Sequence, residues 1–216
     1  EREMWDFDQM DEIKDQVREL SNSVYMTRQI HGVNTFNYAF SANDDEGNSM
    51  LGANGKPLCA ASQTLIPNGS VTISNAGTSA LSATSLEATR NLMKKWTDDR
   101  GNRVPMRPDL LLVPNGMRKT AMMLADTKEE PFVSDHGINV WHGNLKVIEW
   151  DLLDEDKWFL VDTAKMKRSS IWYDARVPKI EQDGPNFDTE VAKYKTVGLW
   201  DVGFKTPFFI YGHDVA

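Results

Sequence analysis

The four histidines are the residues of this chain best suited to acid–base or metal chemistry, and they are scattered as His31, His136, His142 and His213. None belongs to an HxxxH or HxH pattern or to a carboxylate pairing that would place two ligands on one face of an element. Asp135 and His136 could form a general base, but the Ser-Asp-His-Gly stretch around them is typical of an exposed turn. We therefore predict no catalytic residue and no metal site.

Sequence motifs for phosphate and calcium binding are also missing. Neither GxGxxG nor GxxxxGK[ST] occurs, and the acidic stretch 43–48 lacks the ligand spacing of a calcium-binding hand. Cys59 is the single cysteine, so it has neither an internal disulfide partner nor a companion for a zinc site. We expect it to fill space in the core, and we predict no cofactor.

The seven tryptophans are more than a core of this size needs, and tryptophan is frequent both in cores and at interface centres. Three of them lie in apolar runs and are predicted to be core residues: Trp150, Trp158 and Trp200. Three others are predicted to lie at an interface: Trp5, Trp96 and Trp172. A basic cluster at 165–168 could contact DNA or an acidic neighbour, but we interpret it as a solvated turn.

The overall charge argues against a protein that grips nucleic acid with its whole surface. Acidic residues outnumber basic ones by 32 to 24, which gives a net charge of -8, and counterion release needs the opposite sign. Net charge alone does not exclude a surface that faces nucleic acid, because most of the acidic residues can lie elsewhere on the protein. No apolar stretch is long enough for a membrane span, so no membrane partner is expected.

Hydrophobic periodicity predicts helices in the first half of the chain. Apolar residues spaced by three and four positions predict one long helix over residues 11–40. Residues 41–80 are rich in Gly, Asn, Pro and Ser, which predicts a long loop that reaches outward to other subunits. Further helices are predicted from Ser85 to Trp96 and over residues 116–126.

Strands dominate the second half of the prediction. The apolar run 108–114 between two prolines is typical of a buried strand. Later β-rich runs are bounded by Asp, Gly, Pro or Lys, and the predicted strands are 145–150, 158–162, 170–173, 196–204 and 208–211. The fold class is therefore α+β. We expect the long helix to lie against a sheet that includes residues 170–173 and 196–204.

Several short motifs follow one another in a characteristic order. The long helix carries Tyr-Met-Thr-Arg-Gln at 25–29 and ends in Asn-Tyr-Ala-Phe-Ser at 37–41. Beyond the loop come Ser-Leu-Glu-Ala, Asp-Asp-Arg-Gly, Leu-Leu-Val-Pro, Trp-Phe-Leu-Val-Asp and Ile-Tyr-Gly. Over residues 15–212 this order resembles the major capsid proteins of tailed double-stranded DNA bacteriophages and prophages, particularly the branch similar to Mu-type head subunits.

The resemblance implies the tailed-phage major capsid fold, with the long helix as its spine. Residues 1–45 and 166–205 would form a peripheral domain, and residues 46–165 and 206–216 an axial domain. Arg28 would join the three interface tryptophans as a subunit contact. The family's N-terminal arm and extended loop would be absent, and the first residue, Glu1, suggests a lost N-terminal part. Relatives often carry a Ser/His-containing stretch in place of residues 50–55, so the role of that loop stays open.

The implied function is structural: a head subunit that self-assembles into the pentamers and hexamers of an icosahedral shell around double-stranded DNA. Scaffold, portal or decoration proteins would be its partners. The protein would reside in the virion, and in the host bacterial cytoplasm before release. Two alternatives remain open, namely the shell protein of an encapsulin-like nanocompartment, and a soluble α+β enzyme with an unrecognised site.

Overall fold

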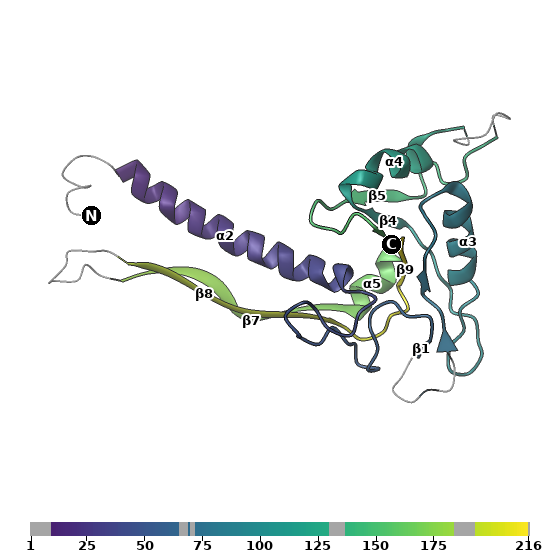
Figure 1. Cartoon of the computed structure of the whole chain (residues 1–216), viewed down its shortest axis with the longest axis horizontal. Coiled ribbons are helices and arrows are strands. Elements are labelled where there is room, and N and C mark those ends of the chain that lie inside the picture. The colour runs from purple at the N-terminus through teal and green to yellow at the C-terminus, as the bar shows by residue number, and fades with distance from the viewer. Residues whose placement is uncertain (1–9, 65–68, 70–71, 130–136, 184–192, 216) are drawn as a thin grey trace. The chain divides into compact units, whose positions relative to one another are not determined.

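The computed structural model describes residues 10–64, 69, 72–129, 137–183 and 193–215. The chain divides into two compact units, each built from two stretches of sequence. Unit 1 comprises Glu1–Gly32 and Trp172–Val202, and unit 2 comprises Val33–Ile171 and Gly203–Ala216. Figure 1 shows the elements, and the order of helices and strands agrees with the predicted α+β class.

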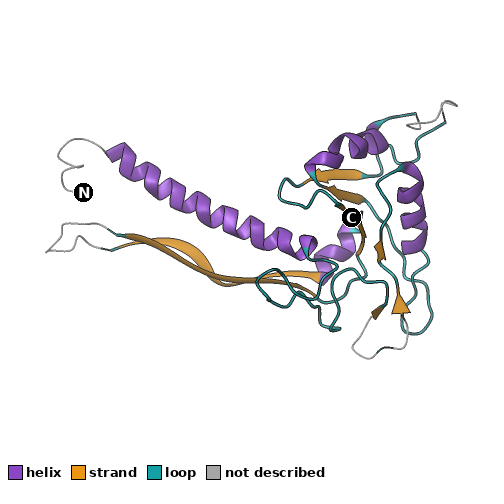
Figure 2. Ribbon diagram, in the orientation of Figure 1, coloured by secondary structure: helices purple, strands orange, loops and turns teal. Residues whose placement is uncertain are grey.

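Unit 1 contains most of helix α2 (Met10–Asn37) and of the paired strands β7 (Ser170–Gln182) and β8 (Tyr194–Phe204). Asp11 and Glu12 lie in the first turn of α2, where negative charge complements the helix dipole. The prediction of a long helix over 11–40 is confirmed, with an end three residues earlier. Strand β7 extends far beyond the predicted 170–173, as the long strands in Figure 2 show.

Unit 2 is organised by a five-stranded sheet with the order β3-β9-β6-β4-β5. Its strands are β3 (Ala76–Gly77), β4 (Leu110–Val113), β5 (Lys146–Glu149), β6 (Lys157–Val161) and β9 (Ile210–Asp214). Strand β6 pairs antiparallel with both β4 and β9, whereas β4–β5 and β3–β9 are parallel pairs. The predicted strands 108–114, 145–150 and 158–162 are confirmed, and the predicted 208–211 strand begins at Ile210 and runs to Asp214.

The central strand β6 is buried on both faces, and its alternate residues belong to two different hydrophobic clusters. Trp158 and Leu160 belong to one hydrophobic cluster, and Phe159 and Val161 belong to the other. All four β4 residues are buried as well. A strand covered on both faces needs apolar residues at every position, which is why these segments are continuous apolar runs rather than alternating ones.

Two helices contribute to the first of these clusters. Helix α3 (Ala83–Met93) begins at the N-cap Ser82, whose side chain accepts the Ser85 N–H while the Ser85 side chain accepts the Ser82 N–H. Ser85 is therefore the third helical residue of a capping box and not the helix start, which corrects the prediction. Helix α4 (Arg118–Asp126) follows the 3-10 turn η1 (Asn115–Met117), and together they confirm the helix predicted at 116–126.

Helix α5 (Thr163–Ser169) was not predicted, and it contains the basic cluster interpreted as a turn. Asp162 caps it by accepting the Lys165 N–H, and its second oxygen accepts the Arg107 N–H at 2.8 Å. Asp109 accepts the backbone N–H and the hydroxyl of Thr163. These two carboxylates connect the end of β6 and the start of α5 to the segment that precedes β4. Such long-range hydrogen bonds leave no trace in the hydrophobic periodicity of the sequence, and helix α5 was therefore not predicted.

The loop predicted at 41–80 is largely irregular, but part of it lies in the interior. It contains only the short strands β1 (Gln63–Thr64), β2 (Thr72–Ile73) and β3 among its described residues. Leu58, Cys59, Gln63 and Asn75 are each at most 1% exposed. The Asn75 amide donates to the Leu58 and Ile210 carbonyls and accepts the Ala60 N–H. The expectation that this whole segment reaches outward is therefore wrong for the part around these residues. Leu58 and Cys59 belong to the second hydrophobic cluster, and the buried amides of Gln63 and Asn75 satisfy the backbone beside them.

Gly212 of β9 is a position where the double-sided burial can be tested. A Cβ there would lie 2.7 Å from the Phe159 ring and 2.8 Å from the Cys59 sulfur, both of which are buried. We predict that Gly212→Ala lowers the free energy of unfolding by about 1–3 kcal/mol, measured by denaturant titration. Gly203→Ala is the matched control, since a Cβ at that position would meet nothing within 4 Å; equal effects of the two changes would contradict the prediction.

His213 of β9 makes the stability of unit 2 depend on pH. Its ring stacks on Trp158 at 4.1 Å, its Nδ1 accepts the Ser79 N–H, and its Nε2 lies 2.8 Å from the Thr89 hydroxyl. Burial lowers its pKa from 6.5 to about 4. Because the folded pKa is depressed, the neutral ring's stabilisation is complete above pH 6.5 and is lost as the pH falls toward 4.

We predict that the wild-type protein loses about 3 kcal/mol more stability than His213→Gln between neutral pH and pH 4. Gln keeps hydrogen-bonding capacity but does not titrate, so the comparison isolates the imidazole. The measurement is denaturant unfolding at a series of pH values. Parallel pH profiles for the two proteins would show that protonation of His213 does not contribute.

Candidate assembly surface

Arg28 of α2 is the centre of a cluster that joins the helix to both strands of unit 1. Its Nη2 donates to Asp174 of β7 at 3.1 Å. Its guanidinium carbon lies 5.0 Å from the ring centroid of Trp172 and 5.4 Å from that of Trp200. Stacking of a guanidinium on aromatic faces stabilises a contact without requiring a deep core. The expected contact of the long helix with this sheet is thus confirmed, and within unit 1 it is made by a cation and two indoles.

Electrostatics reinforce this cluster. The bond from Arg28 is the main cause that lowers the pKa of Asp174 below its ordinary value, and the Trp172 indole N–H, which donates to the same carboxylate at 3.1 Å, acts in the same direction. His31 presents an edge to Trp172 with the ring centroids 6.2 Å apart. We call the paired strands β7 and β8 the hairpin. The face of the hairpin that meets α2 is therefore occupied by a paired charge and aromatic rings.

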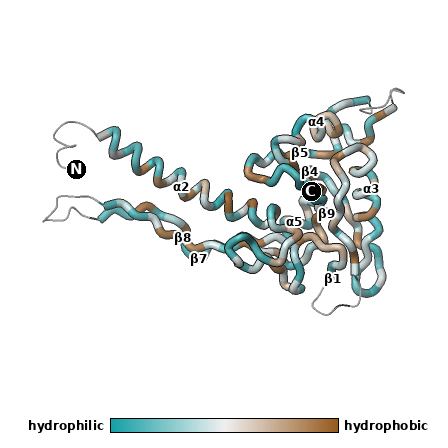
Figure 3. The backbone as a smooth tube through the Cα atoms, in the orientation of Figure 1, coloured by the Kyte–Doolittle hydropathy of each residue, from teal (hydrophilic) through white to brown (hydrophobic). Residues whose placement is uncertain are grey.

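The other face of the hairpin carries apolar side chains that nothing described in unit 1 covers. Glu181 and Lys195 form an ion pair across the two strands at 3.3 Å, which shows that odd-numbered residues of β7 and β8 share a face. On that face lie the exposed apolar side chains Tyr173 (63% exposed), Val177 (58%), Val197 (45%) and Leu199 (63%). We call these four residues the hairpin stripe; hydrophobic stretches of both strands are visible in Figure 3.

The predicted tryptophans have three different fates. Trp172 is 38% exposed and is part of the Arg28 cluster, so it retains some surface. Trp96 is 5% exposed and packs between Phe208 and Tyr211 in the core of unit 2, which leaves it no surface to present to another subunit. Trp5 lies outside the described residues.

The predicted core tryptophans also differ from one another. Trp158 is fully buried, as predicted, and Trp150 packs against the second cluster of unit 2. Trp200 belongs to neither hydrophobic cluster and is half-buried beneath Arg28, so its assignment to a core was wrong. Sequence reasoning missed the hairpin stripe because residues 174–182 were not predicted as strand. The alternation of β8 was the available signal.

Cys59 and His213, whose pKa values are strongly shifted, are both engaged in the packing of unit 2. Burial raises the pKa of Cys59, and His213 has both ring nitrogens in hydrogen-bond contact. Within the described ranges, no group of three or more His, Cys, Asp or Glu side chains is arranged to hold a metal ion. His136 lies outside these ranges. Among the described residues, we find no helix with the length and apolar character of a membrane span.

Unit 2 has a central strand that is buried on both faces, and unit 1 has a strand pair with an exposed apolar face. An exposed apolar face of this kind is typical of a surface that binds other protein molecules. Over residues 1–211 the sequence matches the family described as phage capsid protein, and the chain belongs to that family. It is accordingly a structural subunit of a phage head, found in the virion as part of a homo-oligomeric shell, and not an enzyme. No curated protein matches the sequence significantly.

Arg28 offers a test of how unit 1 is held together. We predict that Arg28→Ala accelerates backbone hydrogen exchange in β7 and β8 by about tenfold, because it removes the ion pair and both stacking contacts at once. The exchange rate of Arg28→Lys should lie between those of the wild type and Arg28→Ala, since an ammonium keeps the charge but cannot stack on the indoles as a guanidinium does. Arg18→Ala is the matched control, because Arg18 forms an ion pair with Asp15 on the exposed surface of the same helix and has no other ion-pair partner among the described residues. Equal exchange in all variants would rule out this role.

Proposed function

We propose that this chain is a major capsid subunit that assembles into pentamers and hexamers of an icosahedral shell enclosing double-stranded DNA. The observation that carries the proposal is the hairpin stripe, because four large side chains exposed in a row on a strand pair are costly unless another molecule covers them. Membership of the phage capsid family supports a second copy as that molecule. The stripe is then one of the repeated contacts from which a shell is built.

The proposed fold is that of the tailed-phage major capsid proteins, with α2 as the spine helix. Unit 1 is assigned to the peripheral domain, and unit 2 to the axial domain. The observed divisions fall after residues 32, 171 and 202, whereas the sequence-based ones fell after 45, 165 and 205. The discontinuous order of both domains along the chain supports the assignment.

Several finer points belong to the same proposal. Within the family, the Mu-type head subunits are the proposed branch, on the order of motifs along the chain. Trp172 and Trp5 remain proposed subunit contacts, whereas Arg28 acts mainly by positioning Trp172 and Trp200. Packaged DNA would be contacted without sequence specificity, and scaffold, portal or decoration proteins are the proposed partners. Before release, the protein would be found in the host bacterial cytoplasm.

The alternatives make different demands on the molecule. An encapsulin-like nanocompartment would share the fold but enclose a protein cargo, and the match to the phage capsid family favours a head subunit. An enzyme would need a site with a shifted general acid or base, and the strongly shifted groups Cys59 and His213 are both enclosed by packing.

Shell assembly gives the direct test. We predict that the complete gene product containing this chain, expressed with its scaffold if one exists, forms closed particles in negative-stain micrographs. Val177→Lys with Leu199→Lys should abolish the particles while leaving the unfolding transition unchanged, because both side chains are exposed and unpacked in unit 1. The matched control, Arg176→Glu, changes an exposed charge on the opposite face of the same strand and should leave assembly intact. Particles formed by the double variant would exclude the stripe as a contact, and complete absence of particles in the wild type would oppose the proposed function.

A further inference from the structure

Unit 2 contains a cleft of about 490 Å³ whose walls carry three cationic side chains. Glu87, Arg90 and Lys94 line it from α3 and the residue after it, at spacings that place them on one helix face. Arg107 lines it from the segment before β4, and Trp141 from the turn before β5. We call this the cationic cleft. Its charge is opposite to that of the chain as a whole.

The cations of this cleft are only partly neutralised. The Arg90 guanidinium is held by Glu87 at 3.1 Å and lies 5.7 Å from the ring centroid of Trp141, so its orientation is fixed in advance. The side chains of Lys94 and Arg107 have no ion-pair or hydrogen-bond partner among the residues that the structure describes. A fixed guanidinium beside two unpaired cations is a receptor for carboxylate or phosphate.

The apolar part of the cleft favours a protein over a nucleic acid. Met106, Pro108, Val140 and Trp141 contribute to its lining, and Val140 is 68% exposed at its rim. A phosphate backbone has no apolar group that would bury this rim. An acidic peptide segment with an apolar side chain next to its carboxylates would cover it. The ligand chemistry is therefore that of carboxylates next to an aliphatic side chain.

One acidic segment of the described chain has this chemistry and is not already neutralised. In the turn at residues 44–48, Asp44 accepts the N–H groups of Glu46 and Asn48 and so holds the backbone in place. The carboxylates of Asp45 and Glu46 are exposed and form no ion pair with a described cation, and Leu51 nearby is 40% exposed. We call residues 44–48 the acidic turn.

The other acidic turns of unit 2 are less suitable. Asp154 and Asp156 are both paired with Lys157, and Glu155 accepts the Gly116 N–H. The turn at 98–102 has the same Asp-Asp-x-Gly-Asn pattern and the same backbone bonds as the acidic turn, but Arg100 replaces Glu46. It serves as a natural comparison with lower negative charge.

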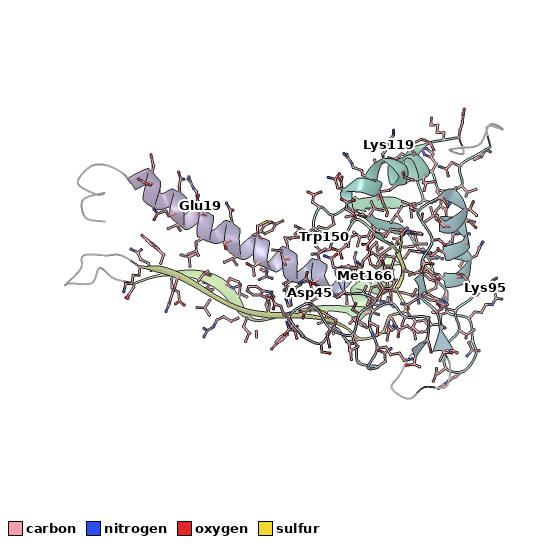
Figure 4. All side chains as sticks on the ribbon, viewed as in Figure 1. Glu19, Asp45, Lys95, Lys119, Trp150 and Met166 are labelled. Atoms are coloured by element: carbon pink, nitrogen blue, oxygen red, sulfur yellow. The ribbon has the colours of Figure 1, made fainter. Side chains whose placement is uncertain are left out.

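The acidic turn and the cationic cleft lie on different sides of unit 2. Figure 4 labels Asp45 of the turn and Lys95, the neighbour of Lys94, and these two residues are far apart. A turn therefore cannot enter the cleft of its own unit. Two complementary patches at different places on one subunit make a head-to-tail contact, and repeated head-to-tail contacts with a fixed rotation close into rings.

We propose that the acidic turn of one copy binds in the cationic cleft of a second copy of this chain. The inference rests on the proposed function in that it supplies a contact from which a ring of subunits is built. Glu46 and Asp45 face Lys94, Arg107 and the free edge of Arg90, and Leu51 covers part of the apolar rim. The same contact repeats around the ring, because each copy provides one turn to one neighbour and one cleft to the other.

Charge exchange tests the contact in the intact chain. Lys94→Glu and Glu46→Lys should each weaken self-association, measured by sedimentation equilibrium, by about tenfold, and the two changes together should restore it to within about threefold of the wild type. Lys95→Glu and Asp99→Lys are the matched controls, since they make the same charge changes beside the cleft and in the sister turn. Single variants that associate as the wild type does, or a double variant that shows no recovery, would overturn the proposal.

A second measurement separates the possible outcomes. Zero-length carbodiimide coupling of a mixture of isotopically light and heavy chains should yield a peptide pair joining Glu46 to Lys94 between different copies. Absence of this pair at about 1 mM protein overturns the contact, even where particles form and the proposed function stands. If Lys94→Glu instead abolishes binding to a short DNA duplex and leaves self-association unchanged, the cleft is a nucleic-acid site and the proposal is wrong.

Discussion

The burial of β6 on both of its faces is the constraint on which the rest of unit 2 depends. Trp158 and Leu160 face one hydrophobic cluster while Phe159 and Val161 face the other, and β4 and β9 flank the strand on either side. A strand in this position tolerates neither polar residues nor extra volume. Gly212 follows from this constraint, because the neighbouring strand must leave room for the Phe159 ring. The carboxylates Asp109 and Asp162 follow too, since the chain must be fastened where it enters and leaves the layer.

Unit 1 is stabilised by a different kind of interaction. A helix and a two-stranded sheet enclose too little volume for a layered core, and the described side chains of α2 before Gly32 are all at least partly exposed. An arginine that stacks on two indoles and binds a carboxylate brings three elements together with few atoms. Because this contact holds α2, β7 and β8 together, the opposite face of the hairpin is not needed for packing within unit 1. That freedom is what allows the hairpin stripe to be apolar and exposed.

The sequence predicted most helices and strands because their periodicity or their framing by prolines reflects burial directly. The run between Pro108 and Pro114 and the long helix are examples. It did not predict helix α5, whose seven residues carry a weak periodic signal and whose cap depends on a carboxylate shared with Arg107. It also placed Trp96 at an interface, because the type of a residue does not distinguish a core from a contact surface. The candidate surface could be found only after β7 and β8 were seen to share a face.

The modest size of the exposed features is consistent with the work that a shell subunit performs. An interface that closes a particle is repeated many times, so each copy can be weak, and errors of docking can be reversed before closure. A strongly apolar patch would instead trap misassembled subunits. In the proposed assembly, the four exposed side chains of the hairpin stripe and the charge complementarity of turn and cleft would give geometric selectivity at low individual strength. The excess of acid over base then has a physical role in the proposed assembly. Subunits of net charge -8 would repel one another at long range unless the cationic cleft of one met the carboxylates of another in the correct orientation.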